Sequence, residues 1–303
     1  MTTQVTTATS RHTEGDPQQN KKSFGRWFAE KGWRHVVAIL VIIYALIPIL
    51  YIVSASLNPG GTLTGSNELF RTIDFENYAG LSSTSFWKWM QNTLVIAIST
   101  SVGTVMMAAA AAYAFSRFRF VGRRFGLTAL LIIQMFPQML AFVAIFLLLL
   151  SLGDVLPMLG LNSTLALIAV YLGGALGVNT FLLYGFFNTI PKELDEAAKI
   201  DGLSHAQIYW MIILRLAAPI LAVVALLSFI STFGDFVIAR VVLQREEQWT
   251  VAIGLYTWVS SQLDANWGQF AAGAIIASVP ILILFLFLQK YIVGGLTAGA
   301  VKG

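Results

Sequence analysis

Between two long apolar runs lies the charged stretch Asn188-Thr189-Ile190-Pro191-Lys192-Glu193-Leu194-Asp195-Glu196-Ala197-Ala198-Lys199-Ile200-Asp201-Gly202. It predicts a short helix whose first residue is Pro191, because the N–H that proline lacks has no partner in a first helical turn. The acidic residues that follow suit the positive end of the helix dipole. Gly202 is expected to end this helix, either with a positive φ or at a close approach between helices.

A second helix is predicted directly after Gly202. Ser204 and Gln207 have the spacing of a capping box, in which each residue satisfies a backbone N–H of the other. This helix is expected to continue through Ile208, Trp210, Ile213 and Leu214. The predicted result is a helix–glycine–helix elbow over residues 188–215, with exposed small alanine side chains and a charged face that another protein can grip. Without a partner, the same pattern describes an amphipathic helix at the membrane interface.

The composition places this elbow in a membrane protein. Of the 303 residues, 57% are hydrophobic and 11% are charged, whereas soluble domains are about one quarter charged. Runs of about 20 apolar residues are long enough to cross a bilayer. The predicted spans are 36–57, 92–115, 127–152, 164–187, 216–239 and 270–291. We therefore expect an all-α integral membrane protein with six transmembrane helices in a domain of residues 35–291, the first helix being a retained anchor and not a signal peptide.

The Lys and Arg residues give the predicted orientation, because cytoplasmic loops carry an excess of positive charge. Of the 19, only Arg71, Lys88, Arg240 and Arg245 fall on the side opposite to the elbow. Both termini and the elbow are therefore expected in the cytoplasm, and the loops 58–88 and 240–267 are expected outside. The net charge of +4 reflects this bias, so it predicts no nucleic-acid partner.

Two terminal segments flank the predicted membrane domain. Residues 1–34 are expected to form a cytoplasmic tail, because their polar first part has little apolar content. Aromatic and basic residues within 23–34 predict a short helix on the membrane surface. Residues 292–303 are expected to form a short cytoplasmic tail, whose glycine content is also typical of a frayed terminus.

Residues that catalysis requires are missing from the sequence. It contains no Gly-x-x-x-x-Gly-Lys-Ser/Thr phosphate loop, no Gly-x-Ser-x-Gly nucleophile turn and no cysteine. The histidines, His12, His35 and His205, are too scattered to predict a metal site. We therefore expect that the chain is not an enzyme by itself and that it holds no cofactor.

Polar residues inside the predicted spans suggest where helices break or line a path. Asp235 is expected to reach the membrane interface at the outer end of its span, and the alternative is a polar contact on a translocation path. Since charged residues within the spans are so few, an ion-coupled secondary carrier is the weaker alternative function. Pro137, between Gln134 and Gln138, predicts a break in the third span. Small residues predict close helix packing at Gly173, Gly174 and Gly177, and less strongly at Ala108 and Ala112.

The elbow resembles the coupling loop of ABC importer permeases, whose Glu-Ala-Ala-x-x-x-Gly motif docks into a cleft on an ATP-hydrolysing subunit. The matching residues are Glu196, Ala197, Ala198, Asp201 and Gly202. The resemblance implies that these residues contact the ATPase. One departure is Arg215, which stands where the family usually has proline; Pro219 follows, so the entry to the next span is expected to bend differently.

A longer series of segments is similar to the second permease subunit of maltose-type sugar importers. In chain order they are Tyr113-Ala114-Phe115-Ser116-Arg117, Phe120-Val121-Gly122-Arg123, Gln134-Met135-Phe136-Pro137, Tyr171-Leu172-Gly173-Gly174, the elbow and residues 295–303. The similarity extends from about Val36 to the end of the chain. In that family the closing segment runs between two ATPase subunits, which implies the same interface for Thr297, Gly299, Lys302 and Gly303.

The resemblance also implies a fold, an assembly and a cargo. The fold is that of type I ABC importer permeases in the bacterial cytoplasmic membrane. The implied partners are a homologous second permease, two copies of an ATPase that bind ATP and Mg²⁺, an external sugar-binding protein reached by loop 240–267, and membrane lipid. The expected cargo is maltose, maltodextrin or a related α-glucoside such as trehalose. The alternative is another oligosaccharide or a polyol, and the sequence assigns no sugar-binding residue.

Overall fold

The computed structural model describes residues 28–59, 69–136, 138–260 and 265–300. Within these ranges the chain is helical and contains no strand. The chain divides into two compact units, Met1–Leu50 and Tyr51–Gly303, and the second holds every site discussed below. The all-helical membrane class expected from the sequence is confirmed.

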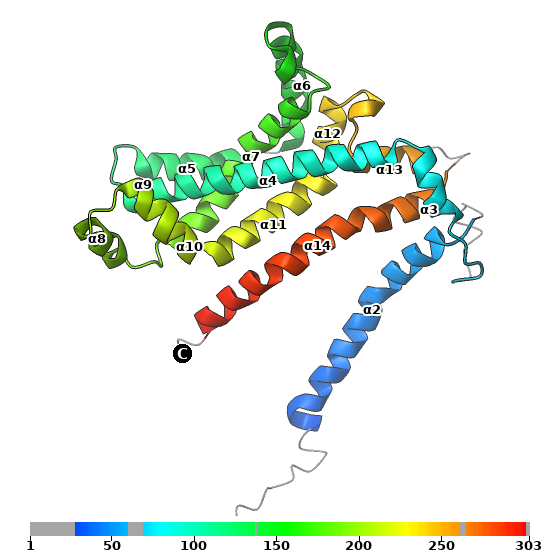
Figure 1. The fold of residues 1–303 in the computed structure, drawn as a ribbon, viewed down its shortest axis with the longest axis horizontal. Coiled ribbons are helices and arrows are strands. Elements are labelled where there is room, and N and C mark those ends of the chain that lie inside the picture. The colour runs from blue at the N-terminus through cyan, green and yellow to red at the C-terminus, as the bar shows by residue number, and fades with distance from the viewer. Residues whose placement is uncertain (1–27, 60–68, 137, 261–264, 301–303) are drawn as a thin grey trace, which may run out of the picture. The chain divides into compact units, whose positions relative to one another are not determined.

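The helices carry the labels of Figure 1, where η marks a π or 3-10 helix. In chain order they are η1 Phe28–Gly32, α2 Trp33–Ser56, α3 Glu76–Gly80, η3 Leu81–Ser83, α4 Phe86–Arg117, α5 Arg123–Gln134, η4 Gln138–Ala141, α6 Phe142–Val155, η5 Pro157–Leu159, α7 Thr164–Phe187, α8 Glu193–Ile200, α9 His205–Gln207, η6 Ile208–Ile213, α10 Leu214–Leu216, α11 Ala218–Gly234, α12 Val237–Val242, η7 Glu246–Gln248, α13 Val251–Ser260 and α14 Trp267–Ala300.

In the described ranges, four helices are long and apolar enough to cross a membrane: α2, α4, α7 and the Trp267–Ile292 part of α14. A fifth candidate is the bent pair His205–Leu216 and Ala218–Gly234, whose axes differ by 79°. These helices account for five of the predicted spans. The remaining one, residues 127–152, is divided between α5 and α6.

The third predicted span is therefore not one continuous helix. Helix α5 ends at Gln134 and the next helical turn begins at Gln138. The predicted break at Pro137, a residue outside the described ranges, accounts for this division, because proline lacks an N–H and clashes with the preceding turn. The predicted break within this span is confirmed.

The predicted boundaries of the other segments also change. Helix α11 ends at Gly234, so residues 235–239 lie beyond it. The predicted external loops 58–88 and 240–267 contain helices of their own, of which α13 is the longest. Residues from Phe28 onward continue into α2, so the described part of the predicted surface helix is not a separate element. At the other end, α14 continues through Ala300, so the tail predicted from residue 292 is helical up to that point.

Helix α4 is central to the second unit, since it packs against both α7 and α11, and α11 in turn packs against α14 (Figure 1). Ala108, Ala109 and Ala112 form a buried small-residue face on α4. Small side chains let helix backbones approach closely. This face belongs to a core cluster that also contains Ile208 and Ile213 of the elbow. The predicted packing role of Ala108 and Ala112 is confirmed.

Close helix packing also explains one of the three glycines for which it was predicted. A Cβ atom on Gly177 would lie 2.2 Å from Cγ of Gln134, so α5 approaches α7 there only because the side chain is missing. A Cβ atom on Gly173 or Gly174 would have nothing within 4 Å. The predicted close approach is therefore found at Gly177 and not at the other two glycines.

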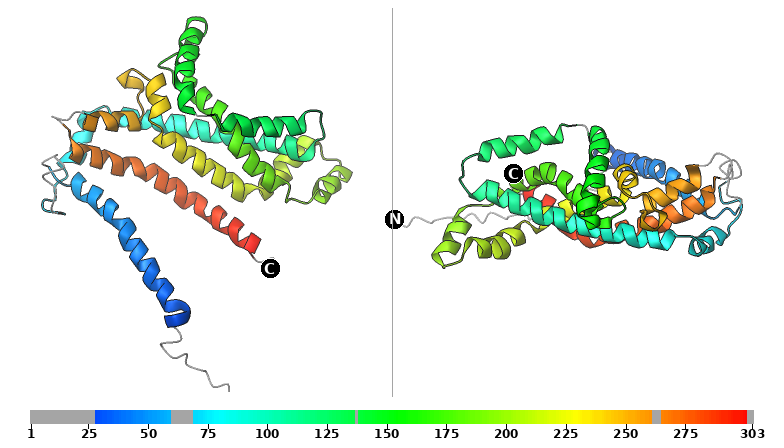
Figure 2. Two further views of the ribbon diagram at one scale, coloured as in Figure 1. Left: turned by 180° about the vertical axis from the view of Figure 1, so that it is seen from behind. Right: turned by 90° about the horizontal axis from the view of Figure 1, so that it is seen from above.

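A second cluster lies at the other end of α4. The Trp89 ring packs against Trp249 and Trp258, with centroid distances of 6.0 and 5.5 Å. The Trp89 indole N–H donates a hydrogen bond of 3.1 Å to the Glu246 carbonyl. These contacts tie the 240–267 region to α4, so Trp249 and Trp258, both partly buried, contribute to packing within the chain. Figure 2 shows the elbow (yellow-green) and α13 (orange) at opposite ends of α4.

Candidate functional site

The first arm of the elbow is α8, and it starts later than predicted. Its N-cap is Lys192, whose carbonyl accepts a hydrogen bond of 3.0 Å from the Glu196 N–H. The Ile190 carbonyl, which would have started a helix at Pro191, instead accepts a hydrogen bond of 3.1 Å from Arg117. This contact with α4 replaces the first predicted helical bond. The acidic first turn predicted for this helix is confirmed.

The turn after α8 is a Schellman motif, in which two backbone N–H groups close the helix end. The Leu203 N–H donates to the Ala198 carbonyl and the Gly202 N–H donates to the Lys199 carbonyl, both at 3.0 Å. Gly202 has a φ of 85°. A Cβ atom there would have nothing within 4 Å. The glycine is therefore needed for its backbone conformation and not for a close approach, which settles the predicted alternatives.

The second arm begins with the predicted capping box. The Ser204 Oγ accepts the Gln207 N–H at 3.3 Å, and the Gln207 Oε1 accepts the Ser204 N–H at 2.8 Å. Helical structure continues from His205 to Leu216, with a π-helical segment in the middle. Pro219 then lies in the first turn of α11 beyond the 79° bend. A bend at the entry to this span was predicted from Pro219.

The two faces of α8 have opposite environments. Asp195 and Ala198, three residues apart, point into the protein and are 7% and 6% exposed. Leu194, Ala197 and Ile200 share the outer face, and Ile200 is 87% exposed. The prediction that both alanines are exposed was therefore wrong for Ala198, because residues three apart share a helix face and Ala198 lies on the inner face with Asp195.

Three of the remaining predicted docking residues also lie on the surface of the elbow. Glu196, Asp201 and Gly202 are exposed, together with Ala197. An exposed apolar face bordered by carboxylates is suited to contact with another protein. The exposed part of the elbow thus combines apolar and acidic side chains on one surface.

An ion pair buried inside the second unit fixes this surface to α4. Nε of Arg117, the last residue of α4, lies 2.5 Å from Oδ2 of Asp195 in α8. The two side chains are 5% and 10% exposed. Arg117 also donates hydrogen bonds of 3.1 Å to the carbonyls of Phe187 and Ile190. The guanidinium therefore joins the end of α7, the start of α8 and the end of α4 at one point.

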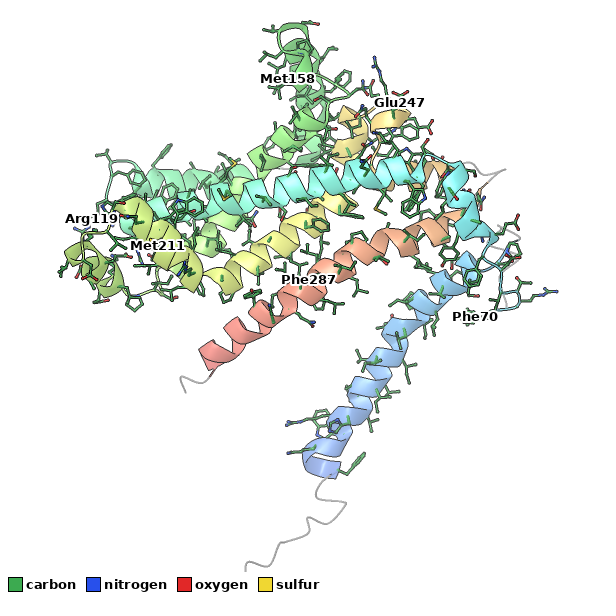
Figure 3. The ribbon with its side chains drawn as sticks, viewed as in Figure 1. Phe70, Arg119, Met158, Met211, Glu247 and Phe287 are labelled. Carbon is green, nitrogen blue, oxygen red and sulfur yellow. The ribbon has the colours of Figure 1, made fainter. Side chains whose placement is uncertain are left out.

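The second arm of the elbow contacts the same end of α4. The Tyr113 hydroxyl donates a hydrogen bond of 3.3 Å to the His205 carbonyl. The Phe118 ring lies edge-on to the His205 ring, with a centroid distance of 5.0 Å. In Figure 3, Arg119 and Met211 mark this end of the unit, and Glu247 marks the opposite end. Both arms are thus held by residues 113–118.

Sequence reasoning missed Arg117 and Asp195 as parts of this site. Tyr113 to Arg117 entered only as a segment similar to other permeases. One signal was available, because Arg117 at the end of an apolar span and the acidic residues of a loop predicted on the same side of the membrane carry opposite charges. The pairing itself needs the folded chain, since 78 positions of sequence separate Arg117 from Asp195.

The predicted tail residues divide into two groups. Thr297 and Gly299 belong to the helical backbone at the end of α14. Lys302 and Gly303 lie outside the described residues. Among the residues that the structure describes, no group of His, Asp and Glu side chains could hold a metal ion.

Comparison with known proteins identifies the family. Residues 104–297 match the model of the binding-protein-dependent transport system inner membrane component. The chain belongs to this family. The matched range begins within α4 and includes the whole elbow. The buried Arg117–Asp195 pair therefore lies within the region that matches the family.

Relatives with curated names are similar along most of their length. The galactooligosaccharides transport system permease protein GanQ of Bacillus subtilis (strain 168) is 40% identical, with 87% of this chain and 92% of the relative covered. The maltodextrin transport system permease protein MdxG of the same strain has the same identity and coverage. The maltose/maltodextrin transport system permease protein MalG of Escherichia coli (strain K12) is 36% identical, with 89% and 95% covered. The resemblance to maltose-type permeases expected from the sequence is confirmed.

Solved structures support the fold. A chain of a bacterial ABC transporter involved in the import of the acidic polysaccharide alginate aligns with a TM-score of 0.69 at 27% identity. The alignment covers 87% of this chain and 97% of that chain. This likeness confirms the ABC importer permease fold and a multi-pass membrane protein.

Proposed function

We propose that this chain is one half of the translocation pore of an ATP-driven sugar importer and that its elbow docks a separate ATPase subunit. One observation carries the proposal: the elbow presents an apolar outer face, with Ile200 87% exposed, while the buried Arg117–Asp195 pair fixes its inner face to α4. A surface that only binds needs no such attachment. A surface that transmits movement does, because separating a buried ion pair leaves an uncompensated buried charge.

The proposed mechanism is alternating access. When the ATPase dimer closes on ATP, it pulls the elbow, and α4 follows because Arg117 and Tyr113 join it to both arms. The spans then open outward, and hydrolysis reverses the movement. In this proposal ATP and Mg²⁺ are bound by the two ATPase copies and not by this chain.

The proposed assembly follows the family. It contains a homologous second permease and an external binding protein. The family description, which names a binding-protein-dependent transport system, supports the binding protein. Both termini and the elbow face the cytoplasm of a bacterial cell, in accord with the distribution of Lys and Arg. The end of α14 and residues 297–303 contact the ATPase subunits. Glu196, Ala197, Asp201 and Gly202 form the main docking surface, and Ala198 supports it from below.

The proposed cargo is maltose, maltodextrin or a related α-glucoside. The MdxG and MalG relatives, named for maltodextrin and maltose, support this choice. A second candidate is a galactooligosaccharide, because GanQ is as similar to this chain as MdxG is. Both candidates are neutral oligosaccharides.

Purification of the complex from its native host tests the proposal. A P-loop ATPase is expected to co-purify, and its activity is expected to rise when a sugar-loaded binding protein is added. A panel of maltose, maltotriose, a galactooligosaccharide, trehalose and a polyol then identifies the cargo. Uptake that follows a proton or sodium gradient without ATP would show that the chain is an ion-coupled carrier instead.

A further inference from the structure

A polar cavity of about 360 Å³ lies between the helices of the second unit. Its walls come from α4, α7 and α11, with Gln134 of α5 and Ile238 of α12 at the margins. The polar residues that line it are Thr100, Gln134, Tyr171, Asn179, Ser228, Ser231, Thr232 and Asp235. Among the described lining residues, Asp235 is the only one that is charged. This volume is within the roughly 300–1,000 Å³ that is typical of small-ligand sites.

The sequence predicted that Asp235 reaches the membrane interface, with a polar contact as the alternative. In the structure its carboxylate makes a polar contact with Tyr171 of α7. Its Oδ1 accepts hydrogen bonds of 2.7 Å from the Tyr171 hydroxyl and 3.0 Å from the Ala239 N–H. Both bonds end on the same oxygen. The carboxylate is thus held in place by Oδ1, while Oδ2 takes part in neither bond.

Three other polar groups in the cavity have unused hydrogen-bonding capacity. The Thr100 hydroxyl is buried, with the residue 2% exposed, and has no partner among the described residues. A buried hydroxyl without a partner costs free energy, so such a group calls for an explanation. The side-chain amides of Gln134 and Asn179 donate to the carbonyls of Gly174 and Ala175, at 3.0 and 2.8 Å. Those bonds use the nitrogens and leave the amide oxygens as acceptors.

We propose that this cavity is a sugar-contact site, at which this subunit itself binds a neutral oligosaccharide during translocation; the inference rests on the function proposed above. Sugar hydroxyls both donate and accept hydrogen bonds. The carboxylate and amide oxygens provide acceptors for them, and the Thr100 hydroxyl provides a donor. The Tyr171 hydroxyl, whose hydrogen is donated to Asp235, provides a further acceptor.

The charge of the cavity also selects the class of sugar. Asp235 repels an anionic sugar, and no described lining residue supplies a cation to bind one. The cavity therefore fits a neutral oligosaccharide and disfavours an acidic one such as an oligouronate. The proposed cargo of this chain therefore differs in charge from that of the related transporter, which is involved in the import of the acidic polysaccharide alginate.

The test uses the complete transporter in proteoliposomes with ATP, maltotriose and its binding protein. The variants are Thr100→Val and Tyr171→Phe, which remove one hydroxyl each with little change in shape. The matched control is Ser101→Ala, because Ser101 is also buried on α4 but its hydroxyl already donates to the Ala225 carbonyl at 2.7 Å and does not line the cavity. Sugar transported, ATP hydrolysed and subunit co-purification are measured together.

Each variant is expected to lower the amount of maltotriose transported per ATP about tenfold, the effect of one well-made hydrogen bond. Subunit assembly and ATP hydrolysis are expected to stay at the parental level, and Ser101→Ala to change nothing. Asp235→Asn is expected to raise the transport of an oligouronate relative to that of maltotriose.

Two results would overturn the inference. One is parental transport per ATP in both hydroxyl variants. The other is a parallel fall of transport and hydrolysis, which indicates a structural defect and not lost sugar contacts. If the parental complex transports no sugar in the panel with ATP, the proposed function itself fails. A parental complex that transports sugar, with silent variants, refutes only the sugar-contact site.

Discussion

Replacing Asp195 by Asn removes the negative charge that faces Arg117 inside the protein. Since both side chains are at most 10% exposed, the guanidinium left behind is almost fully buried. Breaking a buried ion pair by removing one partner costs about 3–5 kcal/mol. We expect the lower end, about 3 kcal/mol, because Arg117 keeps its hydrogen bonds to the Phe187 and Ile190 carbonyls.

Hydrogen exchange in the elbow measures this cost locally. A loss of about 3 kcal/mol in the free energy of local opening lowers amide protection about a hundredfold. The assay is hydrogen–deuterium exchange with mass spectrometry on the full chain in nanodiscs, followed at the amides of residues 196–203. The amides in the middle of α7 are expected to be unaffected, because they lie away from the ion pair.

Two matched variants make the test decisive. Glu193→Gln removes an exposed charge from the same helix and is expected to leave protection unchanged. Arg117→Met combined with Asp195→Leu removes both buried charges and is expected to restore most of the protection. A loss of less than threefold in Asp195→Asn, or an equal loss in Glu193→Gln, would refute the claim that the buried pair holds the elbow.

Three further perturbations test other parts of the structure. Gly202→Ala is expected to cost about 1 kcal/mol in the free energy of local opening, because the φ of 85° strains a residue that has a Cβ. Amide protection in the elbow should therefore fall about fivefold, and unchanged protection would contradict this. Gly254→Ala places a Cβ 2.0 Å from the Trp89 ring, so the thermal unfolding midpoint should fall, whereas Gly173→Ala, with open space, should leave it unchanged. Deleting residues 297–303 should leave membrane insertion intact and weaken co-purification with the ATPase; full co-purification would show that this tail is not a docking element.

Local rules were enough to predict the shape of the elbow. The capping box of Ser204 and Gln207 and the positive φ of Gly202 depend on residues that are neighbours in sequence. The same reasoning located the break near Pro137. It could not place the first helical residue, because the Ile190 carbonyl is engaged by Arg117, which is remote in sequence.

Long-range contacts explain the other misses. The orientation of Ala198 depends on which face of α8 packs against the core. That face is the one that carries Asp195, which pairs with Arg117 of α4. Asp235 faces inward because Tyr171, on another helix, donates a hydrogen bond to it. Neither contact leaves a signal in the local sequence pattern. The sugar-contact cavity could not be predicted for the same reason, although Gln134 and Asp235 were noted individually.

Site-directed cross-linking tests the central claim, that the outer face of the elbow docks an ATPase, most directly. The chain contains no cysteine, so a single introduced cysteine carries the cross-linker alone. Ile200→Cys places it on the most exposed position of the apolar outer face, and Met158→Cys, 60% exposed and away from the elbow, is the control (Figure 3). In the purified complex, a short thiol-to-photoreactive cross-linker at position 200 is predicted to join this chain to the ATPase subunit, and one at position 158 is not. No ATPase product from position 200, or an equal yield from both positions, would contradict the account.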